Sequence, residues 1–77
     1  MKIGFYNDFR PCILKERGVV DISREVRRLQ GGSPQLLLEN IIVNFQFLRP
    51  RLEQLKERGR VIPLESVRLR PPVPRPG

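Results

Sequence analysis

The stretch from Ser33 to Gly59 constrains the fold most, because no other segment is long enough to supply an apolar core. Ser33 can accept a hydrogen bond from the free amides of a helix, and Pro34 suits the first helical position. Gly59 suits the residue just past a helix end. Apolar residues recur between these limits at helical spacing and predict one inward stripe, formed by Leu37, Leu38, Ile41, Ile42, Phe45, Leu48, Leu52 and Leu55.

Pro50 argues against one straight helix over this stretch. In a helix its ring clashes with the carbonyl group of Gln46, and it has no amide hydrogen to donate. Arg49, the residue before it, is disfavoured at helical backbone angles. We therefore expect a kink, or a break into two helices, between Phe45 and Pro50.

The first third of the chain predicts three short strands. Apolar residues alternate along residues 2–6, and two further apolar runs cover residues 12–14 and 19–22. The polar segments between these runs contain turn residues, and Gly18 is available for a left-handed turn position. Together the runs predict an antiparallel meander, whose apolar face needs a cover because so few strands are marginal alone.

Shorter elements flank the helical stretch. Ser23 can cap a helical turn over residues 24–29, and residues 61–62 and 67–70 each suit a short strand. The sequence therefore predicts an α+β fold, with a small antiparallel sheet of about four strands and a kinked or broken helix packed on one face.

The chain of 77 residues fits one small domain, which we expect over residues 1–70. Residues 71–77 contain four prolines and predict an extended, proline-rich linker. Arg68, Pro71 and Pro74 also match the R-x-x-P-x-x-P spacing of SH3-domain ligands. An interdomain linker has the same composition without needing a partner, so an SH3-binding adaptor stays an alternative hypothesis.

The net charge of +7 raises the hypothesis of a nucleic-acid partner. The positive residues form no single run, and the aromatic residues lie in apolar patterns, so nucleic-acid binding is the less favoured alternative. The single Cys12, in a chain without a signal-like segment, indicates a reducing, cytoplasmic setting. No apolar run approaches the roughly 20 residues of a membrane-spanning helix, so no membrane contact is expected.

Residues that commonly carry chemistry are scarce. The chain has no histidine, the most common acid–base residue and metal ligand. Cys12 lies in an apolar run and is interpreted as a buried structural thiol. Glu53 and Glu57 share a helical face, but Arg49 and Lys56 lie alongside to neutralise them. The glycines form no phosphate-binding pattern, and we assign no catalytic, cofactor-binding or metal-binding residue.

Four segments of the chain resemble parts of one family of bacterial enzymes. Residues 1–5 (MKIGF) and 18–23 (GVVDIS) are similar to the N-terminal segment of enzymes of the fumarylacetoacetate hydrolase family. Residues 62–77 (IPLESVRLRPPVPRPG) resemble the family's lead-in, where a V-x-L-x-x-P-V-P-x-P-G run precedes the first catalytic strand. Residues 47–52 (FLRPRL) are similar to the helical part between them. The resemblance extends over the whole chain.

The resemblance implies a parent enzyme that uses Mg²⁺ or Mn²⁺ to hydrolyse, decarboxylate, isomerise or hydrate 2-oxo or 1,3-dicarbonyl acids. In that family an E-x-E pair and a later aspartate hold the metal, which polarises the enolising carbonyl group. This sequence stops at Gly77, where the catalytic domain would begin, so we transfer no metal ligand to it. The implied role is a non-catalytic N-terminal domain that supports the catalytic domain and its oligomer.

A second apolar face of the helical stretch contains Leu36, Val43 and Phe47, which lie away from the inward stripe. If one helix face packs on the sheet, these residues have no cover within the chain. Exposed apolar patches tend to mark contact sites. We therefore predict that these three residues form an interface with the missing catalytic domain or with a second copy of the chain.

Overall fold

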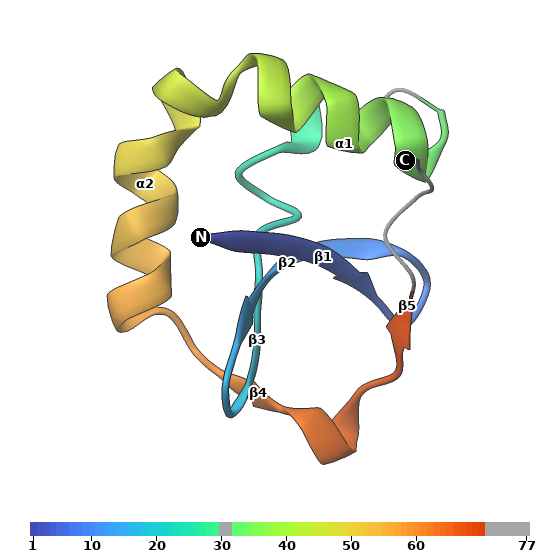
Figure 1. Ribbon diagram of the computed structural model, residues 1–77, viewed down its shortest axis with the longest axis vertical. Helices are drawn as coiled ribbons and strands as arrows, with labels where there is room; N and C mark the ends of the chain where they lie inside the picture. Colours follow the sequence, from blue (N-terminus) through green and yellow to red (C-terminus); the bar gives the residue numbers. More distant parts are fainter. Residues whose placement is uncertain (30–31, 71–77) are drawn as a thin grey trace.

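The structure, a computed structural model, describes residues 1–29 and 32–70 (Figure 1). Its strands are β1 (Lys2–Tyr6), β2 (Arg10–Lys15), β3 (Gly18–Asp21), β4 (Ile62–Pro63) and β5 (Leu69–Arg70). The helices are α1 (Pro34–Val43) and α2 (Phe45–Arg58), with short 3₁₀ turns η1 (Arg27–Leu29) and η2 (Leu64–Ser66). Residues 30–31 and 71–77 lie outside this description, and with them the predicted linker and most of the SH3-ligand pattern.

The five strands form one antiparallel sheet in the order β4-β3-β2-β1-β5. The first three make the predicted meander, in which Ile13 is opposite both Ile3 and Val20. The short strands β4 and β5 pair with β3 and β1 at the two edges. The α+β class is thus confirmed, and the sheet exceeds the predicted size of about four strands because each C-terminal segment finds a free edge.

The helical stretch breaks at Asn44, just before the predicted interval between Phe45 and Pro50. α1 ends at Asn44 because its backbone angles, φ −100° and ψ 15°, depart from helical values. Its side-chain Nδ2 donates to the Asn40 carbonyl at 2.8 Å. The predicted position was therefore wrong, although two helices do form. Pro50 lies inside α2. Because proline has no amide hydrogen, the Gln46 carbonyl lacks its helical hydrogen bond. Gln46 is exposed, so water can supply that bond.

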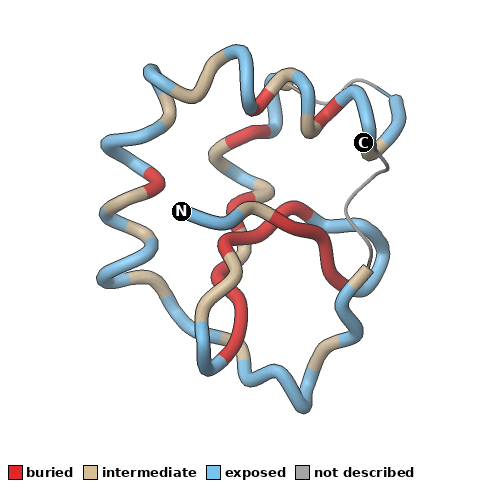
Figure 2. The backbone as a smooth tube through the Cα atoms, viewed as in Figure 1, coloured by how far each residue is buried: buried red, intermediate tan, exposed pale blue. Residues whose placement is uncertain are grey.

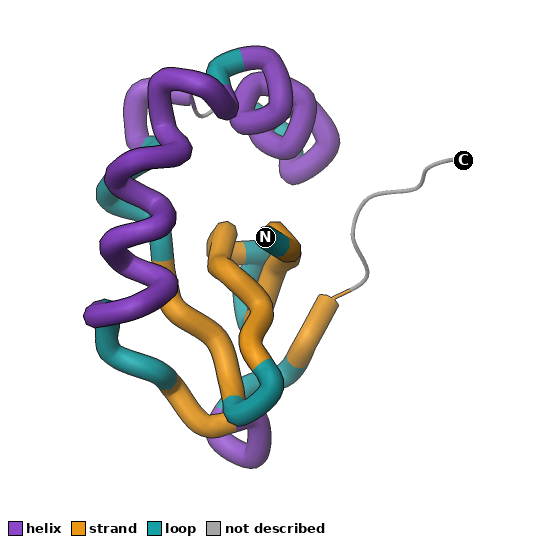
Figure 3. Tube along the Cα trace, turned by 60° about the vertical axis from the view of Figure 1, so that its left-hand side comes forward, coloured by secondary structure: helices purple, strands orange, loops and turns teal. Residues whose placement is uncertain are grey.

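The main core lies between the sheet and the two helices, which cover the same side of the sheet (Figure 3). Four residues of the predicted stripe, Leu38, Phe45, Leu48 and Leu55, are partly buried against this core. Its fully buried members from strands and helices are Phe5, Ile13, Val20, Ile22, Val26, Leu37, Ile41 and Leu52. Ile42 departs from the prediction with 64% exposure, because the chain bends two residues later and α2 leads away from it.

The opposite face of the sheet is also covered, which the sequence did not predict. Tyr6, Cys12 and Val19 form a second buried cluster, against which Ile62 and Val67 of the C-terminal segment pack. Cys12 is fully buried, as predicted, and burial raises the pKa of its thiol to about 11. The two edge strands and the turn between them thus close over the side that the helices leave open (Figure 2).

Gly18 and Gly59 are needed because other backbone atoms pack too close to them for a side chain to fit. Neither glycine adopts a left-handed backbone conformation. A Cβ atom at Gly18 would lie 2.0 Å from the carbonyl oxygen of Ile62, so the residue lets β4 reach β3. A Cβ atom at Gly59 would lie 2.4 Å from the Leu55 carbonyl oxygen. The predicted turn role of Gly18 is wrong, because the residue sits in the β2–β3 register opposite Lys15.

Candidate functional site

The most exposed large apolar side chains of the described residues surround the helix break. Ile42, Val43 and Phe47 are 64%, 80% and 86% exposed, and we call these three residues the bend surface. The chain changes direction at Asn44, where α1 ends and α2 begins, so neither helix extends over these side chains. Figure 1 shows this bend at the corner between α1 and α2, away from the sheet.

The structure places two of the three predicted interface residues together. Val43 and Phe47 flank the Asn44 break, whereas Leu36 lies on α1 about two helical turns before Val43. Leu36 is 47% exposed, and the exposed Glu39 lies between it and the bend in sequence. The predicted exposure is confirmed for all three residues, and their role as an interface stays a prediction.

A second feature joins the two ends of the described chain. In the β1–β5 pair, Leu69 lies opposite Tyr6. The Asn7 amide donates to the Arg68 carbonyl at 2.7 Å, and Asn7 Oδ1 accepts from the Arg68 amide at 3.0 Å. The Asn7 carbonyl accepts from Arg70 Nε at 2.7 Å. Asn7 therefore fastens β5 to the β1–β2 turn through three hydrogen bonds.

The same turn carries backbone strain. Asn7 and Phe9 have φ angles of 52° and 59°, in the left-handed region. Asparagine tolerates this region, but for a bulky residue such as Phe9 it costs on the order of 1–3 kcal/mol. The Phe9 ring offsets part of this cost by contacting Phe5, with centroids 6.2 Å apart, and the Arg70 guanidinium, 5.5 Å from its centroid. The C-terminal strand thus stabilises the strained turn.

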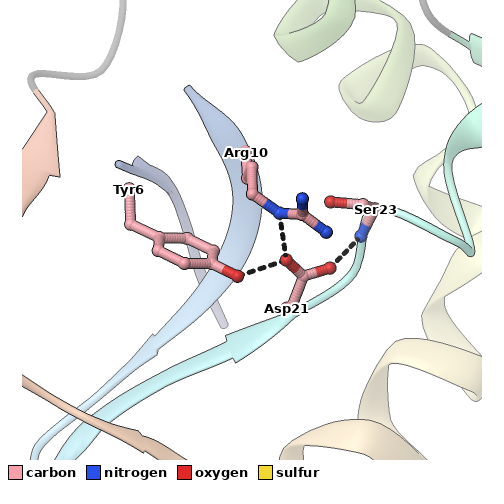
Figure 4. A network of polar contacts seen from close by, with 4 residues as sticks. All are labelled: Tyr6, Arg10, Asp21 and Ser23. Carbon is pink, nitrogen blue, oxygen red and sulfur yellow. Dashed lines mark hydrogen bonds and ion pairs between the residues drawn. The ribbon is translucent and has the colours of Figure 1, made fainter. Parts of the chain in front are cut away.

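A polar network surrounds Asp21 at the end of β3 (Figure 4). Asp21 Oδ2 accepts from the Tyr6 hydroxyl and from Arg10 Nε, the latter at 2.9 Å. Asp21 Oδ1 accepts from the Ser23 amide at 2.7 Å. The sheet register brings these groups together, because Tyr6 is opposite Arg10 and Cys12 is opposite Asp21. The network fixes the point where the chain leaves the sheet.

The network shifts the ionisation of its members. Burial and then the hydrogen bond to Asp21 raise the pKa of Tyr6 to about 12. Burial opposes ionisation of Asp21, but its hydrogen bonds with Tyr6, Arg10 and the Ser23 amide outweigh this and lower its pKa. The Asp21 carboxylate raises the pKa of Arg10. At neutral pH the network therefore holds one carboxylate, one guanidinium and one neutral phenol.

The sequence did not single out this network or the Asn7 contacts. In the sequence, Asn7 lies in a polar segment that predicts a turn, and Asp21 lies within the run 19–22 that predicts a strand. An acidic residue between Val20 and Ile22, in a run that is otherwise apolar, was the available signal for a buried polar partner. Its partners could not be read from sequence, because they lie 15 and 11 residues away and depend on the strand register.

The predicted neutralisation of Glu53 is confirmed, because Arg49 Nε pairs with its carboxylate at 3.0 Å and lowers its pKa. Over residues 1–29 and 32–70, no three His, Cys, Asp or Glu side chains are grouped so that they could hold a metal ion. Neither helix in the same ranges combines the length and the apolar character that crossing a membrane requires.

Comparisons of the chain with protein-family models, with curated proteins and with solved structures found no match.

Proposed function

We propose that this chain is a non-catalytic N-terminal domain of an enzyme that resembles the fumarylacetoacetate hydrolase family. It comprises residues 1–70, followed by the proline-rich linker 71–77 and a metal-dependent catalytic domain. The domain supports that catalytic domain and works in the cytoplasm, where the single buried Cys12 stays reduced. The resemblance of both chain ends to the family supports this assignment.

The observation that carries the proposal is the attachment of β5 to the sheet. Residues 67–70 begin the segment that resembles the family's lead-in to the catalytic domain. Here Leu69 and Arg70 pair with β1, and Asn7 makes three hydrogen bonds with Arg68 and Arg70. This attachment holds the start of the lead-in on the domain as far as Arg70, which favours a supporting role.

The bend surface supplies the contact with the catalytic domain in this proposal. Its three side chains are apolar and highly exposed, and they lie on two helices that the core holds in place through Leu37, Ile41 and Leu52. Apolar patches of this kind tend to mark contact sites. The catalytic domain is the occupant that we propose, because the resemblance implies that domain independently of the helices.

The Mg²⁺ or Mn²⁺ ion that the family uses does not fit the residues of this chain. Its sequence contains no E-x-E pair, and the described residues offer no group of three ligands. The metal and the enolising chemistry therefore belong to the catalytic domain, and the 77 residues contribute support alone.

The gene sequence downstream of the Gly77 codon tests this proposal. The expected result is an open frame that continues into a strand and then an E-x-E pair with a later aspartate. A stop codon directly after Gly77 in a complete gene would contradict the proposal and favour a free-standing module.

A further inference from the structure

A cleft of about 520 Å³ lies between the segment that follows β3 and the helix α2. Its charged lining consists of Arg10, Arg24, Arg27, Arg51, Asp21 and Glu25. Four arginines against two carboxylates give this lining a net charge of +2. The cleft is thus a concave, positively charged site within the described residues. An anion could bind there whether or not a catalytic domain follows.

Both carboxylates of the cleft are already engaged. Asp21 accepts hydrogen bonds from the Tyr6 hydroxyl, from Arg10 Nε and from the Ser23 amide. Glu25, whose side chain is only 12% exposed, pairs with Arg51 at 3.4 Å. These contacts leave the carboxylates little capacity to neutralise the other arginines of the lining.

Three arginines keep donors for a ligand. Arg10 is held by Nε alone, so its two terminal amino groups have no hydrogen-bond partner among the described residues. In Figure 4 these amino groups point away from Tyr6, toward the side of Ser23. Arg24 and Arg27 are exposed, and within residues 1–29 and 32–70 their side chains make no ion pair or hydrogen bond.

Ser23 lines the same cleft beside the fixed Arg10. Its Oγ atom is buried, so a ligand in the cleft does not reach it. The Ser23 side chain acts on Asp21 instead, because it helps to lower the pKa of that carboxyl group. Ser23 thus helps to keep charged the carboxylate that orients Arg10.

We propose that this cleft binds a small dianion that carries oxygen acceptors, either a phosphate group or a dicarboxylate. Guanidinium groups suit both, because their planar N–H donors match the paired oxygens of phosphate and carboxylate groups. Arg10, fixed by Asp21, is the oriented donor of the site. Arg24 and Arg27 supply the remaining positive charge.

The test is an amide NMR titration of the full 77-residue chain near neutral pH, at low chloride, with inorganic phosphate and separately with malonate. The site predicts saturable shifts at residues 21–27 and at Arg51, with a dissociation constant below about 10 mM for at least one anion. Saturation by phosphate alone identifies a phosphoryl ligand, and saturation by malonate alone a dicarboxylate. Absence of saturable shifts with both anions overturns the proposal.

Two double variants separate the site from general charge attraction. R24Q/R27Q removes two cleft charges from side chains that make no contact to lose, and it should weaken binding at least about tenfold. R58Q/R60Q removes the same charge beyond the cleft lining, at the end of α2, and should change binding by less than about twofold. Equal loss in both variants, with melting curves unchanged, overturns the proposal as well.

Discussion

Replacing Tyr6 with phenylalanine removes one hydrogen bond from the Asp21 carboxylate while keeping the buried ring. A hydrogen bond to a charged group contributes about 1.5–3 kcal/mol to the free energy of unfolding. Because Asp21 keeps Arg10 Nε and the Ser23 amide as partners, we expect the lower end, about 1.5 kcal/mol. A core of this size seldom supplies more than about 3–5 kcal/mol, so the loss is about 30–50% of the total.

Chemical denaturation measures this loss. With a urea m-value of about 1 kcal/mol/M, the unfolding midpoint of Tyr6→Phe should fall by about 1.5 M. Phe5→Tyr is no suitable control, because Phe5 is buried in the main core. Asp8→Asn changes an exposed residue of the adjacent turn and should leave the midpoint nearly unchanged.

Alkaline titration reads the burial of the phenol together with its hydrogen bond to Asp21. The chain has one tyrosine and no tryptophan, so the near-ultraviolet tyrosinate absorbance reports Tyr6 alone. The folded pKa of Tyr6, about 12, lies above the ordinary value of 10. Its contribution to stability is therefore complete below pH 10 and is lost as the pH rises from 10 to about 12.

Two results would refute this reasoning. The first is an unchanged urea midpoint for Tyr6→Phe. The second is a tyrosinate midpoint near 10 in the folded protein, the same as in the denatured chain. The first result means that the phenol does not donate to Asp21. The second means that the phenol is neither buried nor bonded to Asp21 in the folded protein.

Three further predictions follow from the core, the bend surface and the β5 attachment. Ile41→Ala and Leu52→Ala each truncate a buried core residue, so each should cost about 2–5 kcal/mol and unfold most of the domain in a circular dichroism melt. Leu36→Ala is the exposed control. An unchanged melt for both core variants would mean that the core lies on another face of the helices. The isolated chain should self-associate through its bend surface, and V43E/F47E should make it monomeric by light scattering with a similar melting temperature. The control Q35E/Q46E adds the same charge at exposed polar positions, and a parent chain that is already monomeric at high concentration contradicts the idea. Asn7→Ala removes the side-chain bond to the Arg68 amide and strains a left-handed position, so amide exchange at Arg68 and Arg70 should accelerate, while unchanged exchange would mean that Asn7 does not hold β5.

The parts of the fold that sequence could predict are those set by local periodicity. Ile3, Ile13 and Val20 lie opposite one another in the three strands that the apolar runs predicted. Leu37 and Leu52 are buried as the helical stripe required. Both patterns depend only on residues close in sequence, and hydrophobic burial enforces them.

The failures occur where two distant segments decide the outcome. The predicted inward stripe includes Ile42, but α1 ends one residue after it and leaves Ile42 exposed. The second cluster around Tyr6 needs the C-terminal strands, which fold back over the sheet from about 60 residues away. Pattern alone cannot show such a cover.

The candidate interface was predictable in part, because its exposure follows from local helical periodicity. A helical projection placed Val43 and Phe47 away from the core stripe, and both are highly exposed. The projection could not show that the two residues flank a bend while Leu36 stays apart on α1. The arginine cleft was not predictable, since it joins β2, the segment after β3 and α2.

We propose that these 77 residues support a catalytic domain on the same polypeptide, and the mass and activity of the native protein can test this proposal. An antibody against the domain can recover that protein from the cells that express it, for mass measurement and for an acylpyruvate cleavage assay. We expect a polypeptide much longer than 77 residues, with cleavage that requires Mg²⁺ or Mn²⁺ and is lost with a chelator. A native polypeptide of 77 residues without such activity would contradict it.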